Sequence, residues 1–131
     1  MGLSAYTMIL AADGTEKRAE NIVPGDMVKN PFTGKDQAVR KVWQGPAVGM
    51  FRIAADDGGT LDLNEDHAVL TGGGLMKAAQ IQAGTVLRTA AGTARCVEAT
   101  RLLGDFMVYD VVLEDDGSQP GLIANGYCVG S

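Results

Sequence analysis

Short apolar runs of strand length recur along the chain, and turn-forming residues separate them. Val, Ile, Leu and Thr dominate the runs, and the glycines between them supply the positive φ angles that tight hairpins need. The runs are YTMIL (6–10), QAVRKVW (37–43), MFRIA (50–54), TLDL (60–63), HAVLT (67–71), GTVLRT (84–89), RCVEAT (95–100) and MVYDVVL (107–113). Segments 16–22 and 75–81 are compatible with a short helical turn or a packed loop. The pattern predicts a mostly β fold of many short strands without long helices.

A single offset of 59 residues aligns three separate parts of the chain. Residues 18–29 match residues 77–88, Gly14 matches Gly73, and the Asp-Asp-Gly triplet at 56–58 matches the triplet at 115–117. In the longest match the similar pairs are Ile22 with Ile81, Gly25 with Gly84, Val28 with Leu87, and Lys29 with Arg88. Turn-rich β sequence produces one such match by chance, but three at one offset favour a repeat. We therefore predict one pseudo-symmetric domain, residues 1–131, with interleaved halves at 1 to about 60 and about 61 to 131.

Composition excludes several classes of partner. The net charge is −5 and acidic and basic residues are interspersed, so there is no basic stripe for nucleic acid or an anionic membrane. No apolar run approaches the roughly 20 residues of a membrane span, and the first residues lack the pattern of a signal peptide. Cys96 and Cys128 are too few for a disulfide scaffold and are not spaced as a metal site. We expect a soluble monomer without metal or cofactor.

The strongest candidate for chemistry is His67, the only histidine, in the stretch TLDLNEDHAVLT at 60–71. The repeat aligns His67 with Met8, so a titratable ring stands where the other half has an apolar side chain. Imidazole transfers protons near neutral pH more readily than any other side chain. The alternative is a half-buried histidine at a strand end whose nitrogens are satisfied by Asp66 or by backbone groups.

Three stretches together resemble the Hint domain of inteins, bacterial intein-like domains and the autoprocessing part of hedgehog proteins. They are LSAYTMILAADGTEKRAENIVPGDMV (3–28), TLDLNEDHAVLT (60–71) and MVYDVVLEDDGSQPGLIANGYCVGS (107–131). They follow the order of the family over essentially the whole chain, and their combination at these separations is more specific than any one of them. The resemblance implies a β horseshoe with pseudo-two-fold symmetry, in agreement with the repeat.

The resemblance also implies a self-processing activity and its site residues. In this family a cysteine at the first domain residue attacks the preceding peptide carbonyl, and the fold binds the developing oxyanion and protonates the leaving nitrogen. Asn64 lies where the family has a threonine and keeps a hydrogen-bond donor. His67 matches the histidine that protonates the nitrogen, and Asp110 matches the aspartate that steers the attacking group. The implied partner is the flanking polypeptide of the chain itself, and thiol chemistry suits a reducing cytoplasm.

Both ends of the chain depart from the family pattern. Gly2 occupies the position of the nucleophilic cysteine and has no side chain with which to attack. Ser131 occupies the position of the terminal asparagine whose cyclisation cuts the downstream bond, and Gly130 replaces the histidine before it. Either the cysteine was replaced or this is a naturally silent copy, and the Met1-Gly2 start favours an engineered or trimmed form. The altered end favours the intein-like branch, which cleaves or transfers its upstream flank, over full splicing.

The remaining candidates have simpler explanations. We expect Cys96 and Cys128 to be small buried apolar groups rather than substitute nucleophiles, and Trp43 to be a core residue. The acidic pairs at 56–57 and 115–116 precede glycine, which is typical of hairpin turns rather than of a catalytic pair or a calcium loop. A competing hypothesis is a non-catalytic β module that binds a peptide at an open strand edge.

Overall fold

The computed structural model describes residues 1–47 and 49–131 and consists almost entirely of short strands. Two single 3-10 turns interrupt them, η1 (Ala19–Asn21) and η2 (Ala78–Gln80). The strands are β1 (Leu3–Ser4), β2 (Met8–Leu10), β3 (Glu16–Arg18), β4 (Met27–Lys29), β5 (Asp36–Pro46), β6 (Met50–Ala55), β7 (Thr60–Asn64), β8 (Ala68–Thr71), β9 (Gly74–Lys77), β10 (Val86–Thr89), β11 (Gly92–Leu102), β12 (Met107–Leu113), β13 (Gly121–Ala124) and β14 (Tyr127–Gly130). The predicted mostly β class is confirmed.

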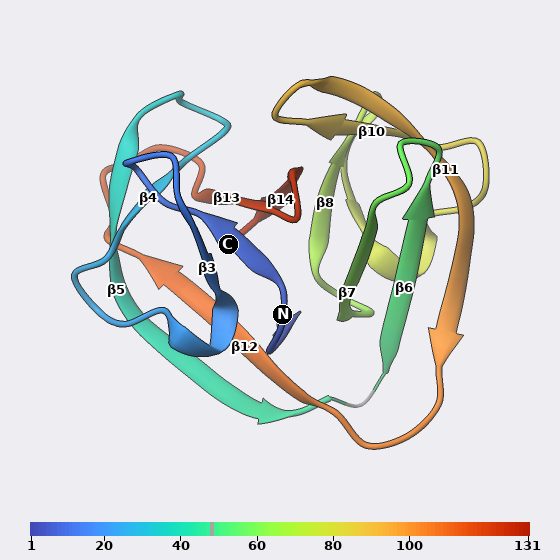
Figure 1. The fold of residues 1–131 in the computed structure, drawn as a ribbon, viewed down its shortest axis with the longest axis horizontal. Coiled ribbons are helices and arrows are strands. Elements are labelled where there is room, and N and C mark those ends of the chain that lie inside the picture. Colours follow the sequence, from blue (N-terminus) through green and yellow to red (C-terminus); the bar gives the residue numbers. More distant parts are fainter. Residues whose placement is uncertain (48) are drawn as a thin grey trace.

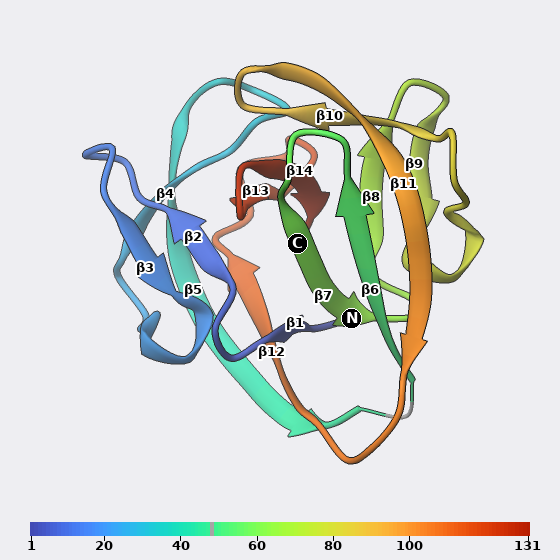
Figure 2. The ribbon, with the colours of Figure 1, turned by 45° about the vertical axis from the view of Figure 1, so that its right-hand side comes forward.

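The strands form two lobes joined at one end, which gives the molecule a horseshoe outline (Figure 1). One lobe holds β2 to β5 with β12 and β13, and the other holds β6 to β11. Long antiparallel pairs, β5 with β12 and β6 with β11, run along the two arms (Figure 2). Each of these pairs joins an early strand to a late one, so the chain interleaves its strands between the lobes. Both termini lie in the space between the lobes.

Backbone hydrogen bonds repeat between the lobes and show the two-fold symmetry directly. The η turns are 59 residues apart, and the Gly25 and Gly84 amides that follow them each donate to a residue of a long strand, Val39 and Cys96. The amide of Ala19 donates to Thr7 over 2.8 Å, and that of Ala78 donates to His67 over 2.9 Å. The division of the chain at about residue 60 stays a prediction.

These bonds correct the alignment near His67. Its structural counterpart is Thr7, 60 residues earlier, and not Met8. Likewise Gly14, at φ 87°, corresponds to Gly74, at φ 104°, and not to Gly73. The second half therefore has one residue fewer between this segment and its η turn. The equivalent of His67 in the first half, Thr7, is therefore a fully buried polar residue rather than an apolar one.

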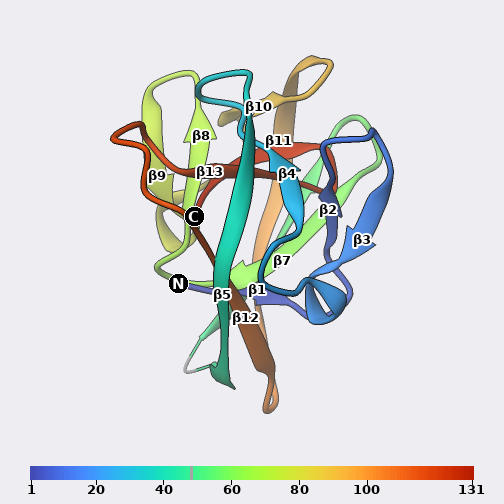
Figure 3. The ribbon, with the colours of Figure 1, turned by 90° about the vertical axis from the view of Figure 1, so that its left-hand side faces the viewer.

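The first strand, β1, is the innermost element of the fold. Leu3 pairs with Tyr109 of β12 on one side and with Leu63 of β7 on the other, and its side chain is completely buried. Figure 3 shows β1 between the pair formed by β5 and β12 on one side and β7 on the other. The residue that precedes Leu3 is thereby held between two lobes, because β7 and β12 belong to different ones.

The last hairpin brings the C-terminus to the same place. Asn125 and Gly126 connect β13 to β14 with φ angles of 51° and 85°, the conformation of a two-residue hairpin turn that Asn-Gly favours. The Asn125 side chain accepts from the Met8 amide and donates to the Thr60 carbonyl. These bonds fix β14, which ends at Gly130.

The prediction that Trp43 is a core residue was wrong, since 59% of it is exposed. A register shift between Val112 and Leu113 of β12 leaves Arg40 of β5 without a partner. The extra residue reverses which side chains of β5 face inward, so Val42 packs against the core and Trp43 faces outward, over the space between the lobes.

We expect Leu3→Ala to lower the free energy of unfolding by about 2–5 kcal/mol, because the lost methyl groups leave a cavity between two strands. Denaturant unfolding followed by circular dichroism measures the change. Leu103→Ala is the matched control, since Leu103 is 89% exposed, and should change stability by less than about 0.5 kcal/mol. Equal effects of the two substitutions would contradict the central position of β1.

Candidate active site

Gly2 is buried between Asn64 and Asp110. The amide of Asn64 donates to the Gly2 carbonyl over 2.8 Å. On the other side Leu3 pairs with Tyr109, so the antiparallel register places Gly2 opposite Asp110. Two of the predicted site residues thus flank Gly2, the position at which the resemblance predicts a nucleophile.

The turn between β7 and β8 bears Asn64 and a third predicted residue, His67. The amide of His67 donates to the Asn64 carbonyl over 3.1 Å, which closes a four-residue turn. The Asn64 side chain donates to the Gly49 carbonyl over 3.2 Å, and its oxygen accepts from the Asp66 amide. One N–H of the Asn64 side chain is therefore already bonded, and its predicted donation to the scissile carbonyl would need the other.

The ring of His67 is 1% exposed and connects this turn to the last strand. Its Nε2 lies 2.7 Å from the Gly130 carbonyl oxygen. A carbonyl only accepts, so Nε2 carries the proton and donates it. In the neutral ring Nδ1 is then a bare acceptor, and this buried nitrogen has no hydrogen-bond partner among the described residues. Nδ1 is the atom of His67 that remains available for proton transfer.

Burial lowers the pKa of His67 below its ordinary value, since the charged ring would lose its hydration. The bond to Gly130 and the negative charges of Asp110 and Asp66 oppose this effect, but they do not outweigh it. The ring is therefore neutral at pH 7. A neutral imidazole with a free nitrogen is ready to act as a base.

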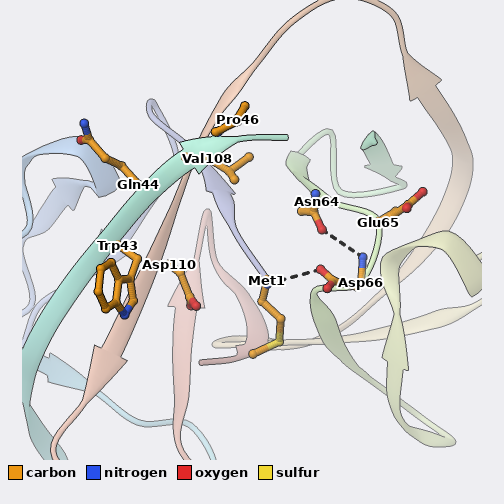
Figure 4. A pocket seen from close by; sticks show the side chains of 10 residues that line it. Met1, Trp43, Gln44, Pro46, Asn64, Glu65, Asp66, Val108 and Asp110 are labelled. Carbon is orange, nitrogen blue, oxygen red and sulfur yellow. Dashed lines mark hydrogen bonds and ion pairs between the residues drawn. The ribbon is translucent and has the colours of Figure 1, made fainter. Parts of the chain in front are cut away.

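Asp110 lies on a cleft of about 610 Å³ that opens beside Gly2. Its Oδ1 is buried without a partner in the described part of the chain. Trp43 stands next to Asp110 on one wall of the cleft, while Asn64, Glu65 and Asp66 form the other wall (Figure 4). Met1 lies between the two walls.

The C-terminal residue lies in the same region. Ser131 donates its hydroxyl to the carbonyl of Val111, the residue after Asp110. His67 binds Gly130 and Val111 binds Ser131, so each of the last two residues is hydrogen-bonded to a residue at or next to the predicted site. All five predicted site residues therefore lie in the region where the two chain ends meet: Gly2, Asn64, His67, Asp110 and Ser131.

The other candidates behave as expected of structural residues. Cys96 and Cys128 are buried free thiols, and burial raises the pKa of both. The oxygens of Asp57 and Asp115 accept from amides two residues later, as in hairpin turns. Within residues 1–47 and 49–131, no cluster of three potential metal ligands occurs and no helix is long and apolar enough to cross a membrane.

Sequence reasoning missed three residues of the site. Gly49 accepts from both the backbone of Glu65 and the side chain of Asn64 and anchors the turn. Glu65 and Trp43 line the cleft. One signal was available in the sequence: the quartet Ser-Ala-Tyr-Thr at 4–7 has the same polar ends as Asn-Glu-Asp-His at 64–67. Comparing these quartets identifies the turn, but not the contact with Gly49.

No family model matches the sequence, and no curated protein does. Solved structures, in contrast, match over nearly the entire chain. The gp41-1 intein is 20% identical over 99% of this chain and 98% of its own, with a TM-score of 0.84. A bacterial intein-like domain from Clostridium thermocellum is 23% identical over the same shares, with a TM-score of 0.84. A DnaB intein from Synechocystis sp. PCC 6803 is 18% identical over 99% of this chain and 97% of its own, with a TM-score of 0.81. The chain therefore has the Hint fold of inteins.

We expect the free energy of unfolding to fall as the pH drops below about 6.5, the pKa of an unfolded histidine. The folded chain has the lower pKa for His67, so in this window the unfolded chain binds more protons. Acid then favours unfolding, by up to about 1.4 kcal/mol per pH unit. Denaturant unfolding between pH 7.5 and about 5 measures the slope.

His67→Gln is the control for this prediction. Its amide retains a donor for the Gly130 carbonyl but does not titrate. The slope near pH 6 should disappear in this variant, and an unchanged slope would show that another group causes it.

Proposed function

We propose that this chain is a self-processing domain that acts on the peptide bond preceding Gly2, and that this copy stops before the first acyl shift. The observation that carries the proposal is the position of one buried imidazole between both chain ends. The turn that bears His67 binds the Gly2 carbonyl, and the ring itself binds the Gly130 carbonyl. The fold shared with inteins and with a bacterial intein-like domain supports it.

The proposed first step needs a thiol at residue 2. The sulfur would attack the carbonyl carbon of residue 1, a C–S bond would form, the C–N bond would break, and the nitrogen of residue 2 would take a proton. Nδ1 of His67 would accept the thiol proton and return it to that nitrogen. Its lowered pKa keeps the ring neutral, so that Nδ1 is free to accept the proton, and it favours the return step, because the buried cation readily gives the proton up.

Asp110 would position the reacting groups in this step. The register places it opposite residue 2, and its free Oδ1 is an acceptor for the attacking thiol. Its negative charge also favours the protonated ring of His67. With Gly2 in place of a cysteine no attacking atom exists, and the site is assembled without its nucleophile.

The other chain end favours cleavage or transfer over splicing. Ser131 has no side-chain amide that could cyclise on its own backbone, so the downstream bond would stay intact. The acyl group of the upstream polypeptide would then pass to water or to another nucleophile. The host polypeptide of the domain would be its substrate.

The edges of the sheet disfavour a peptide-binding module. The strands at the edges of the described part of the chain, β3, β4 and β9, have only three or four residues each. β3 carries three charged side chains, Glu16, Lys17 and Arg18. Short, charged edges discourage the addition of another strand.

We expect Gly2→Cys with a reporter fused upstream of Met1 to release the reporter when a thiol such as dithiothreitol is added. Gel analysis over time measures the rate. Adding His67→Ala should slow release by about 100- to 10,000-fold, since proton transfer contributes rate factors of this size. Absence of cleavage in every folded variant, or equal rates with and without His67, would refute the proposal.

A second variant allows for the tight packing at residue 2. A Cβ there would lie 2.5 Å from Cγ2 of Val108, so either this side chain or the entering backbone must shift. The test therefore includes Gly2→Cys combined with Val108→Gly, because the Cβ of Val108 would also lie only 2.6 Å away and glycine removes both atoms. The unmodified Gly2 fusion should release nothing and serves as the blank.

A further inference from the structure

The cleft beside Gly2 already contains the residue that precedes the proposed scissile bond. Met1 lies in it between the wall of β5 and β12 and the turn that follows β7 (Figure 4). Any polypeptide that continues upstream of Met1 must leave through this cleft. Its lining residues are therefore placed to contact the upstream flank.

The cleft carries negative charge that is only partly balanced. Three carboxylates line it, those of Glu65, Asp66 and Asp110, and the described residues of its lining include no lysine, arginine or histidine. Glu65 is paired with Arg101 over 3.2 Å, outside the cleft. Oδ1 of Asp110 has no hydrogen-bond partner in the described residues.

The balance changes once the chain continues upstream. Asp66 pairs with the amino group of Met1 over 3.4 Å. In a longer chain this nitrogen is an uncharged amide, so Asp66 loses its cation. Two carboxylates, Asp66 and Asp110, then face the incoming polypeptide, and within the described residues neither forms another ion pair.

The opposite wall suits the stem of a long side chain. Trp43, Pro46 and Val108 line it, and Trp43 is 59% exposed. The ammonium group of Lys41 lies 4.8 Å from the centre of the indole ring, within the range of a cation–π contact. Lysine and arginine bury their aliphatic stems against such surfaces while the charged end reaches a carboxylate.

We propose that this cleft recognises the two residues that precede Gly2 and favours basic side chains there over acidic ones. The inference rests on the proposed function, because it names the sequence class of the polypeptide that the site would process. A basic residue would replace the cation at Asp66 and draw the upstream backbone against Trp43. An acidic residue would meet two carboxylates and be repelled.

The test compares Gly2→Cys fusions whose two preceding residues are Lys-Lys, Gln-Gln or Glu-Glu. We expect thiol-induced release to be about three- to tenfold faster for Lys-Lys than for Glu-Glu at about 50 mM salt, and nearly equal at about 500 mM. Asp66→Lys should reverse the order of the three fusions. Glu98→Gln removes an exposed charge that does not line the cleft and should leave the ratio of rates unchanged.

Equal rates for all three fusions, in a protein that does cleave, would overturn the inference but not the proposed function. If none of the fusions cleaves, the proposed function fails, and the unmodified Gly2 proteins with the same three extensions still test the cleft. The Lys-Lys form should then melt at a higher temperature than the Glu-Glu form at low salt, and Asp66→Asn should reduce the difference. Identical melting temperatures would overturn the inference by this second route.

Discussion

The hydrogen bond from the buried His67 ring to the Gly130 carbonyl is the interaction on which the site depends. It joins a turn of the β7 and β8 lobe to the last strand. By committing Nε2 it also decides which nitrogen remains free, since a carbonyl can only accept. The ring is buried and has no second hydrogen-bond partner among the residues that the structure describes, and this burial keeps it neutral. The position and the tautomer of His67 thus follow from this contact, and its neutral charge follows from its burial.

The symmetry of the fold explains where this contact arises. Thr7 and His67 occupy equivalent turns, and both are buried polar residues. In the first half Thr7 bonds Ser4 within its own turn over 2.7 Å. In the second half the larger ring of His67 reaches beyond its turn to the C-terminal strand. The repeat builds the same scaffold twice, and the candidate chemistry lies where one copy departs from it.

Much of the fold could be predicted from sequence because strands and turns have local signals. The short apolar runs predicted the strands, and the match of Gly25 with Gly84 helped to predict the repeat. The bulge at Arg40, which exposes Trp43, and the one-residue slip that pairs His67 with Thr7 have no such signal. Both depend on pairing with distant strands. The resemblance identified the site residues, whereas the cleft wall with Glu65 and the anchor at Gly49 are products of tertiary packing.

The most direct test of this account is the state of the single imidazole ring. A long-range proton–nitrogen NMR spectrum of the ¹⁵N-labelled protein at pH 7 contains one histidine pattern, because the chain has one histidine. We predict the neutral tautomer protonated at Nε2, with the chemical shift of a bare nitrogen at Nδ1. A ring protonated at Nδ1 alone would contradict the bond from Nε2 to Gly130, and a ring protonated at both nitrogens would contradict its neutral charge. Either result would exclude the proposed path of the proton.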